Sequence, residues 1–180
     1  MTGAEVDVAF IQEPAHRPNP SLSQEAQGIP LIDLSNADAD ALVREIGHAC
    51  RQWGFFQIIN HGVPLDRLHR VEEAVRKFFH LSLDEKRKVK RDARKVLGYY
   101  DSEHTKNVLD WKEVFDYTAN EPTLAAASVD EDDDRVAYWE NQWPQNPPEM
   151  RKACQEYAKD MVELAKRLME LVAMSLGLPA

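Results

Sequence analysis

Six histidines carry the most obvious metal-binding chemistry in this 180-residue sequence, and they lie between His16 and His104. His61 is the most suggestive of them, because it stands directly after an apolar segment and before Gly62. A transition-metal centre needs several ligands that converge on one ion, and the sequence places no such partners around this side chain. We therefore interpret His61 as a residue whose ring caps a helix or stabilises a turn through a hydrogen bond. The sequence predicts no metal ligand and no catalytic residue in the chain.

Two charged runs are the next candidates for binding chemistry. Residues 86–95 carry seven positive charges in ten positions, a pattern typical of a nuclear-localisation segment or an anion-binding patch. The preceding Asp84 and Glu85 favour the alternative of a solvated helix face, because acidic residues stabilise the start of a helix. The acidic residues 130–134 lack the glycine and the alternating spacing of a calcium-binding loop, so we predict that they form a solvated loop.

Composition narrows the classes of partner. The chain is 43% hydrophobic with a formal net charge of -9, which allows a modest core but disfavours general binding to nucleic acids or anionic membranes. No apolar run approaches the roughly 20 residues that span a bilayer, and the first ten residues lack the features of a secretory signal. Cys50 and Cys154 have no CxxC spacing, so we expect both to be reduced, buried, small hydrophobic residues. We expect a cytoplasmic protein, with a nuclear location as the alternative suggested by the basic run, and small molecules or proteins as partners.

Apolar patterning predicts a fold that begins after a proline-rich arm. Three prolines prevent a regular helix in residues 1–28, which we expect to be extended or partly disordered. One domain is expected over residues 29–180. Its apolar, β-branched segments predict strands over residues 29–34 and 55–60, and the second strand has apolar residues on both faces, so both faces should be covered.

Helical periodicity predicts the longer elements. One helix should start at Asn36 or Asp38 and stop at Gly54, and a second should begin at about Leu65. A third is predicted over residues 149–176, and its apolar stripe widens towards the end, so we expect an exposed patch there that favours self-association. Residues 97–118 fit either strands or a covering loop. The predicted fold class is α+β, mostly helical, with about four helices and two to four short strands.

The segment WGFFQIINHGVP, residues 53–64, resembles the N-terminal signature of plant 2-oxoglutarate/Fe(II)-dependent dioxygenases. Further matches follow in family order: FFHLSLDEK at 78–86, DWKE at 110–113, WPQNPP at 143–148 and SLGL at 175–178. Together they are similar to the N-terminal half of flavonol-synthase-like enzymes of specialised or hormone metabolism. Ser82 stands where many relatives have proline, which should only loosen the end of a helix.

The resemblance implies that, in a complete enzyme, a jelly-roll barrel follows this region. That barrel holds Fe(II) with a His-x-Asp pair and a distant His, and an Arg-x-Ser motif binds 2-oxoglutarate. No histidine here is followed at the second position by Asp or Glu, and Arg-x-Ser is absent, so we expect no barrel and no cofactor in this chain. Fe(II), 2-oxoglutarate and a small-molecule substrate are implied only for the complete enzyme. By analogy with loops that contact ligands, Tyr99, Tyr100 and Trp111 are candidates for the mouth of its substrate pocket, with simple packing as the alternative.

Three functions remain open at this point. The first is the N-terminal portion of an Fe(II)/2-oxoglutarate-dependent oxygenase, acting on a small metabolite or hormone-type substrate and inactive alone. The second is a non-catalytic protein-binding module, or a truncated product that pairs with a full-length relative. The third is a nuclear or nucleic-acid-associated protein that uses the basic run, although the net charge makes nucleic acid an unfavourable partner.

Overall fold

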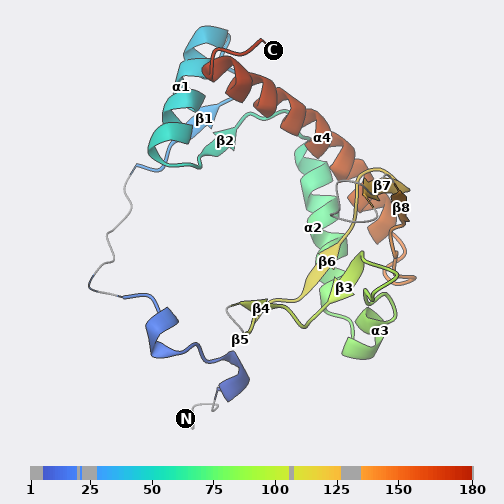
Figure 1. Ribbon diagram of the computed structural model, residues 1–180. Coiled ribbons are helices and arrows are strands. Elements are labelled where there is room, and N and C mark those ends of the chain that lie inside the picture. The colour runs from blue at the N-terminus through green and yellow to red at the C-terminus, as the bar shows by residue number, and fades with distance from the viewer. Residues whose placement is uncertain (1–5, 20, 22–27, 106–107, 127–134, 180) are drawn as a thin grey trace. The chain divides into compact units, whose positions relative to one another are not determined.

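The computed structural model describes residues 6–19, 21, 28–105, 108–126 and 135–179, and the chain divides into two compact units (Figure 1). The strand–helix unit comprises residues 24–72 and 152–180, and the hairpin unit comprises residues 1–23 and 73–151. The predicted acidic loop at 130–134 and part of the predicted extended arm lie outside the described residues.

The strand–helix unit is built on a short parallel sheet. Strands β1 (Leu31–Asp33) and β2 (Gln57–Ile59) pair in parallel, and α1 (Ala39–Gln52) supplies the crossover that a parallel pair requires. The Asp38 carboxylate caps α1 by accepting a backbone N–H of its first turn at 2.9 Å. Gly54 has a positive φ of 74° just beyond the helix, a conformation that glycine adopts without strain. The predicted start and stop signals of this helix are therefore confirmed.

The core of this unit brings together β1, α1 and the C-terminal part of α4 (Met150–Ser175). Its buried members are Ile32, Leu34, Leu42, Ile46, Ala49 and Leu171. Partly buried side chains packed around them are Val43, Phe56, Ile58, Leu164, Leu168 and Val172. Cys154 is buried, but Cys50 is exposed near the C-terminal end of α1, so the prediction of two buried cysteines is wrong for Cys50.

Strand β2 is covered on one face only. Phe56 and Ile58 pack against the core, whereas Phe55 is 55% exposed and Ile59 is 41% exposed. The strand is also shorter than the predicted 55–60. The expectation that both faces are covered is wrong among the described residues of this unit, because a two-stranded sheet backed on one side leaves its other side open.

The hairpin unit contains short antiparallel strand pairs. Its elements also include the end of α2 (Leu65–Phe79), the short helix α3 (Leu83–Arg87) and two 3-10 turns, Val8–Phe10 and Pro14–His16. The pairs are β3 (Gly98–Tyr100) with β6 (Val114–Asp116), β4 (His104–Thr105) with β5 (Val108–Leu109), and β7 (Thr123–Ala126) with β8 (Val136–Trp139). The alternative of strands within residues 97–118 is thus correct. Ser82 does not merely loosen a helix end, because its hydroxyl accepts the Glu85 N–H and caps α3.

Aromatic rings form the core of the hairpin unit. Phe78 and Tyr99 are fully buried, and the Phe78 ring contacts the rings of Tyr99 and Phe115 in tilted or edge-to-face geometry at centroid distances of 6.1 and 5.1 Å. Phe115 and Tyr117 in turn contact the indole of Trp143. Such geometries are the favourable ones for aromatic pairs.

The described residues therefore form an α+β, mostly helical fold with no closed barrel, as predicted. They contain eight short strands in two-stranded sheets, more than the two to four expected, because strands of two to four residues are too short to show an alternating pattern. None of the helices in the described ranges is long and apolar enough to cross a membrane.

The glycine that begins β3 generates a first prediction. Gly98 has a φ of 116°, and a methyl group at this position would collide with the Val89 carbonyl oxygen. We expect Gly98→Ala to lower the free energy of unfolding by about 2 kcal/mol or more, because backbone strain and a backbone clash add. Gly62→Ala is the matched control: Gly62 also has positive φ, with no atom within 4 Å of the added methyl. Chemical denaturation should show the larger loss for Gly98→Ala, and equal losses would contradict the clash.

The one-sided burial of β2 generates a second prediction. Phe56 packs against the core and Phe55 is mostly exposed. Phe56→Ala should destabilise the protein by about 2 kcal/mol, whereas Phe55→Ala should cost less than about 1 kcal/mol, since only the first removes core contacts. Denaturant midpoints of the two variants provide the comparison. A greater loss for Phe55→Ala would show that the opposite face of the strand is the packed one.

Candidate functional site

The three aromatic residues proposed from sequence lie in different environments. Tyr99 is fully buried and Tyr100 is 9% exposed, both on β3, while Trp111 is 69% exposed and contacts the Phe10 ring at 4.6 Å between centroids. Neighbouring residues of a strand point to opposite faces, so Tyr99 and Tyr100 do not share one. The structure does not bring the three rings together, and their role at a substrate pocket stays a prediction.

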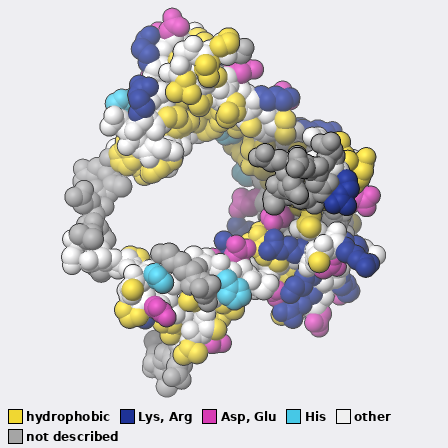
Figure 2. Space-filling view, in the orientation of Figure 1, with side chains coloured by type: hydrophobic (Ala, Val, Ile, Leu, Met, Phe, Trp, Pro, Cys, Tyr) yellow, Lys and Arg dark blue, Asp and Glu magenta, His cyan; other side chains and the backbone are white. Residues whose placement is uncertain are grey.

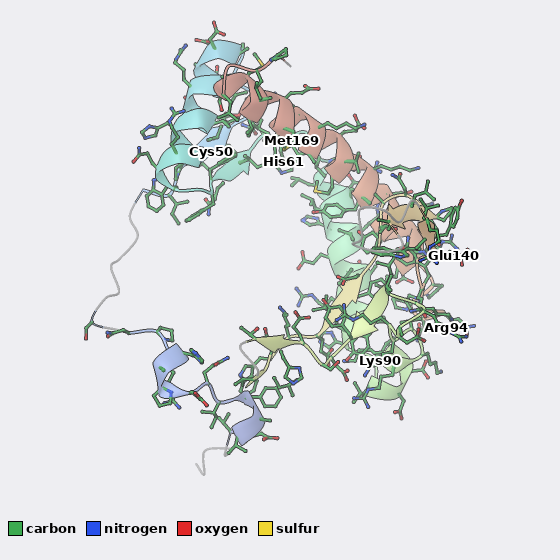
Figure 3. All side chains as sticks on the ribbon, in the orientation of Figure 1. Cys50, His61, Lys90, Arg94, Glu140 and Met169 are labelled. Carbon is green, nitrogen blue, oxygen red and sulfur yellow. The ribbon has the colours of Figure 1, made fainter. Side chains whose placement is uncertain are left out.

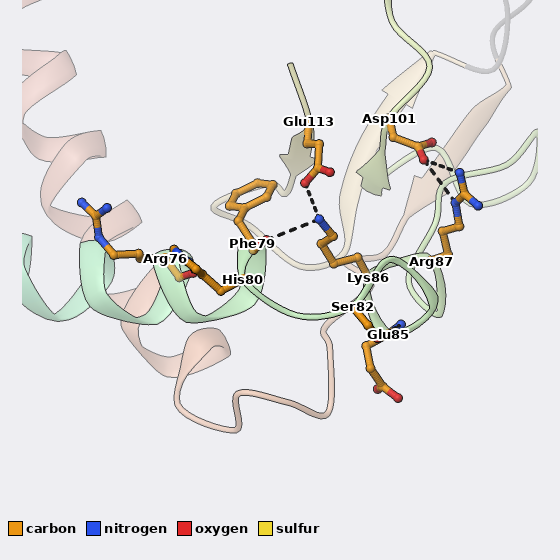
Figure 4. A network of polar contacts seen from close by, with 9 residues as sticks. All are labelled: Arg76, Phe79, His80, Ser82, Glu85, Lys86, Arg87, Asp101 and Glu113. Carbon is orange, nitrogen blue, oxygen red and sulfur yellow. Dashed lines mark hydrogen bonds and ion pairs between the residues drawn. The ribbon is translucent and has the colours of Figure 1, made fainter. Parts of the chain in front are cut away.

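The polar centre of the hairpin unit is a buried lysine (Figure 4). The Lys86 residue is 6% exposed, and its Nζ donates to Glu113 Oε2 at 2.5 Å and to the Phe79 carbonyl at 3.3 Å. The same ammonium lies 5.6 Å from the centroid of the Tyr99 ring. Carboxylate, carbonyl and ring together replace the water that the cation loses on burial. This arrangement holds a charge in place and leaves the ammonium closed to a substrate.

Burial also controls the ionisation of Tyr99. It raises the pKa of the Tyr99 hydroxyl to about 12, with the negative charges of Glu113 and Asp101 contributing in the same direction. The phenol is therefore neutral at physiological pH. A neutral, buried phenol is suited to packing and not to general-base chemistry.

Most of the basic run is neutralised by partners within the same unit. Arg87 donates to Asp101 through Nε at 3.1 Å and Nη2 at 2.6 Å, and Lys90 reaches the other oxygen of that carboxylate at 3.2 Å. Burial acts to raise the pKa of Asp101, but the hydrogen bonds from Arg87 and Lys90 outweigh it and hold the pKa below its usual value. Arg91 stacks on the Tyr100 ring with its Cζ 3.3 Å from the centroid.

The interpretation of residues 86–95 as a solvated helix face is correct for exposure and wrong for secondary structure, because eight of the ten residues are exposed but only Lys86 and Arg87 are helical. Helix α3 ends at Arg87, Lys86 is buried, and Arg87 and Lys90 are tied to one carboxylate. Arg94 and Lys95 are the members of the run whose side chains form no ion pair with another described residue. They border a cleft of about 390 Å³, opposite residues 138–143. Sequence reasoning missed this cleft, because its two walls are far apart in the chain.

The histidines make local contacts rather than a metal centre. His61 Nδ1 accepts the Val63 N–H at 3.1 Å, which confirms the predicted turn-stabilising bond. The Nδ1 atoms of His80 and His104 lie 2.7 and 3.0 Å from the backbone carbonyls of Arg76 and Ser102. Within the described ranges, no three His, Cys, Asp or Glu side chains lie close enough to hold a metal ion. The described donors therefore do not fit the iron site that the sequence resemblance implies for a complete enzyme.

Comparison with curated proteins identifies plant relatives. The chain is 36% identical over 152 residues to the bi-functional coumaroyl CoA and feruloyl CoA ortho-hydroxylase Diox4 of Ruta graveolens, covering 82% of this chain and 37% of that protein. It is 32% identical over 155 residues to a flavonol synthase/flavanone 3-hydroxylase of Matthiola incana, covering 83% of this chain and 48% of the relative. The chain thus spans less than half the length of these two relatives.

Comparison with solved structures also identifies an iron- and 2-oxoglutarate-binding protein as similar to this chain. The structure of JOX2 in complex with 2OG, Fe and JA superposes with a TM-score of 0.73 at 28% identity, over 99% of this chain and 47% of that chain. The sequence model of the "non-haem dioxygenase in morphine synthesis N-terminal" family matches residues 29–146. The chain therefore belongs to this family, the N-terminal region of plant 2-oxoglutarate/Fe(II)-dependent dioxygenases.

Proposed function

We propose that this chain is the N-terminal portion of an Fe(II)/2-oxoglutarate-dependent oxygenase that acts on a small plant metabolite or hormone. In this proposal, residues outside 1–180 supply the iron and 2-oxoglutarate ligands, and the chain alone has no oxygenase activity. The observation that carries it is the family match over residues 29–146 in a sequence without a His-x-Asp or Arg-x-Ser motif.

The open face of the strand–helix unit supports a role in packing against another protein layer. Parallel sheets are normally covered on both faces, yet Leu31 on β1 is 57% exposed and Ile59 on β2 is 41% exposed. Figure 2 shows hydrophobic side chains gathered over α1, the small sheet and the C-terminal part of α4. A surface of this kind favours association.

A second candidate function uses the same open face. The chain is then a non-catalytic module that pairs with a full-length relative, which would cover the face with its own surface. The two functions differ in one measurable respect, because only the first requires iron-dependent turnover once the remaining part of the enzyme is joined to the chain.

The absence of a donor set generates the next prediction. Anaerobic titration of the chain with Fe(II) and 2-oxoglutarate should give no visible metal-to-ligand charge-transfer band, because the sequence has no His-x-Asp pair and the described residues hold no cluster of three donors. A full-length 2-oxoglutarate dioxygenase in the same cell is the positive control. Joining the chain to the C-terminal part of such a relative should restore the band and 2-oxoglutarate turnover if the proposed function is right. A band from the chain alone would overturn its assignment as a non-metal-binding portion, and a folded, iron-binding fusion without turnover would favour the pairing module.

The end of α4 generates a prediction about association. Leu168 and Leu171 pack into the core, while Met169 is 66% and Leu176 is 69% exposed. We expect the chain to self-associate through this surface and to bind the uncharged dye Nile red, since contiguous exposed apolar groups favour both. The double variant Met169→Gln/Leu176→Gln should be more monomeric in sedimentation and bind less dye.

The matched control replaces two exposed apolar residues of the hairpin unit, Val8→Gln and Leu124→Gln, which are 81% and 62% exposed. It should leave association unchanged. A strictly monomeric parent chain over a wide concentration range, without dye binding, would show that the strand–helix unit does not use this surface for association.

A further inference from the structure

The cleft beside the end of the basic run has features of a ligand site. Its volume is about 390 Å³, at the lower end of the range of small-molecule pockets. One wall carries Lys88, Arg94 and Lys95, and the other carries Tyr138, Trp139 and Trp143. A smaller hollow of about 240 Å³ shares Lys88 and Trp143 with it. Cationic and aromatic residues therefore border one space that is large enough for a small molecule.

Backbone hydrogen bonds fix the conformation of the turn that carries Arg94 and Lys95. The Asp92 carboxylate accepts the backbone N–H groups of Arg94 and Lys95 at 2.7 and 2.8 Å, and the Asp92 N–H donates to the Lys95 carbonyl at 2.8 Å. These bonds close a tight turn. The hydrogen bonds from Lys95 and Arg94 also lower the pKa of Asp92, so the turn keeps its charged acceptor at neutral pH.

The opposite wall is held by side-chain amides. Gln142 Nε2 donates to the Leu97 carbonyl at 2.6 Å. Asn141 accepts the Thr118 N–H at 2.8 Å and donates to the Thr118 carbonyl at 2.9 Å. Both walls are thus fixed by hydrogen bonds to neighbouring backbone, and little ordering is required when a ligand enters.

The charges that line the cleft favour an anion. Lys88 pairs with Glu85 at 2.6 Å, but Arg94 and Lys95 are exposed and form no ion pair with another described residue. Glu140 also lines the cleft, and Figure 3 places Arg94 and Glu140 on the same side of the unit. Among the described lining residues, Glu140 is the one carboxylate beside Lys88, Arg94 and Lys95, so these residues carry a positive excess, and Glu140 offers an acceptor for a donor group on the ligand.

We propose that this cleft binds a small aromatic anion, a carboxylate or phosphate group carried on an aromatic ring. Arg94 and Lys95 hold the anionic group through charge-assisted hydrogen bonds. The half-buried rings of Trp139 and Trp143 contact the aromatic part. The site is independent of iron chemistry, because every residue that it uses lies within the hairpin unit of this chain.

The experiment uses the four tryptophans as reporters. In the full chain labelled with ¹⁵N, phenyl phosphate and benzoate should shift the indole N–H signals of Trp139 and Trp143, whereas those of Trp53 and Trp111 should stay in place. Inorganic phosphate and phenol, each alone, should bind at least about tenfold more weakly, because each lacks one of the two recognised groups. The relative affinities of phenyl phosphate and benzoate decide which anionic group the cleft prefers.

A charge-matched pair of variants tests the assignment. Arg94→Gln/Lys95→Gln should weaken phenyl phosphate binding by about tenfold or more without changing the denaturation midpoint. Lys152→Gln/Lys166→Gln removes the same charge from α4, where both side chains are exposed, and should retain the affinity of the parent chain. Equal weakening by both pairs, unchanged binding in the first pair, or equal shifts at all four indoles would overturn the proposal and indicate only unspecific attraction.

Discussion

The buried ammonium group of Lys86 is the constraint on which the hairpin unit depends. An unpaired charge in a protein interior is costly, so the surrounding structure must supply its partners at fixed positions. Those partners are the Glu113 carboxylate, the Phe79 carbonyl and the Tyr99 ring. They belong to the approach to β6, the end of α2 and strand β3. Pairing the Lys86 ammonium therefore requires these three elements to be correctly positioned relative to one another.

A buried ion pair does not by itself imply a large net stabilisation, because desolvation offsets much of the attraction. The ion pair between Lys86 and Glu113 instead favours one packing arrangement of the surrounding elements over others. Asp101 follows β3 directly and binds Arg87 and Lys90, which places the basic segment against the same strand. The Tyr99 N–H then donates to the Val89 carbonyl at 2.9 Å, and Gly98 allows this close approach. Charge pairing and backbone pairing thus specify the same register.

Local signals in the sequence were sufficient for the long helices, but they did not predict the end of α3 or the contacts between segments. The boundaries of α1 follow from a capping carboxylate and a glycine stop, both within a few residues of the helix. The conformation of residues 86–95 depends instead on ion pairs with Asp101 and Glu113. These two carboxylates come close to the basic run only when β3 and β6 pair. The exposure of Phe55 has the same origin, because strand composition does not reveal how many layers cover a sheet. The candidate cleft required residues 88–96 and 138–143 to meet, and no periodic pattern encodes that meeting.

The distribution of polar groups in this chain separates two kinds of site. Around Lys86 the ammonium, the Glu113 carboxylate and the Phe79 carbonyl are paired with one another inside the unit, so this cluster is structural. At Arg94 and Lys95 the backbone N–H groups donate to Asp92, while the side-chain charges have no ion-pair partner among the described residues. A hydrogen-bonded turn whose cations lack an ion-pair partner in the described part of the chain incurs a small ordering cost when it binds an anion. The same basic run therefore provides structure at its beginning and an available binding surface at its end.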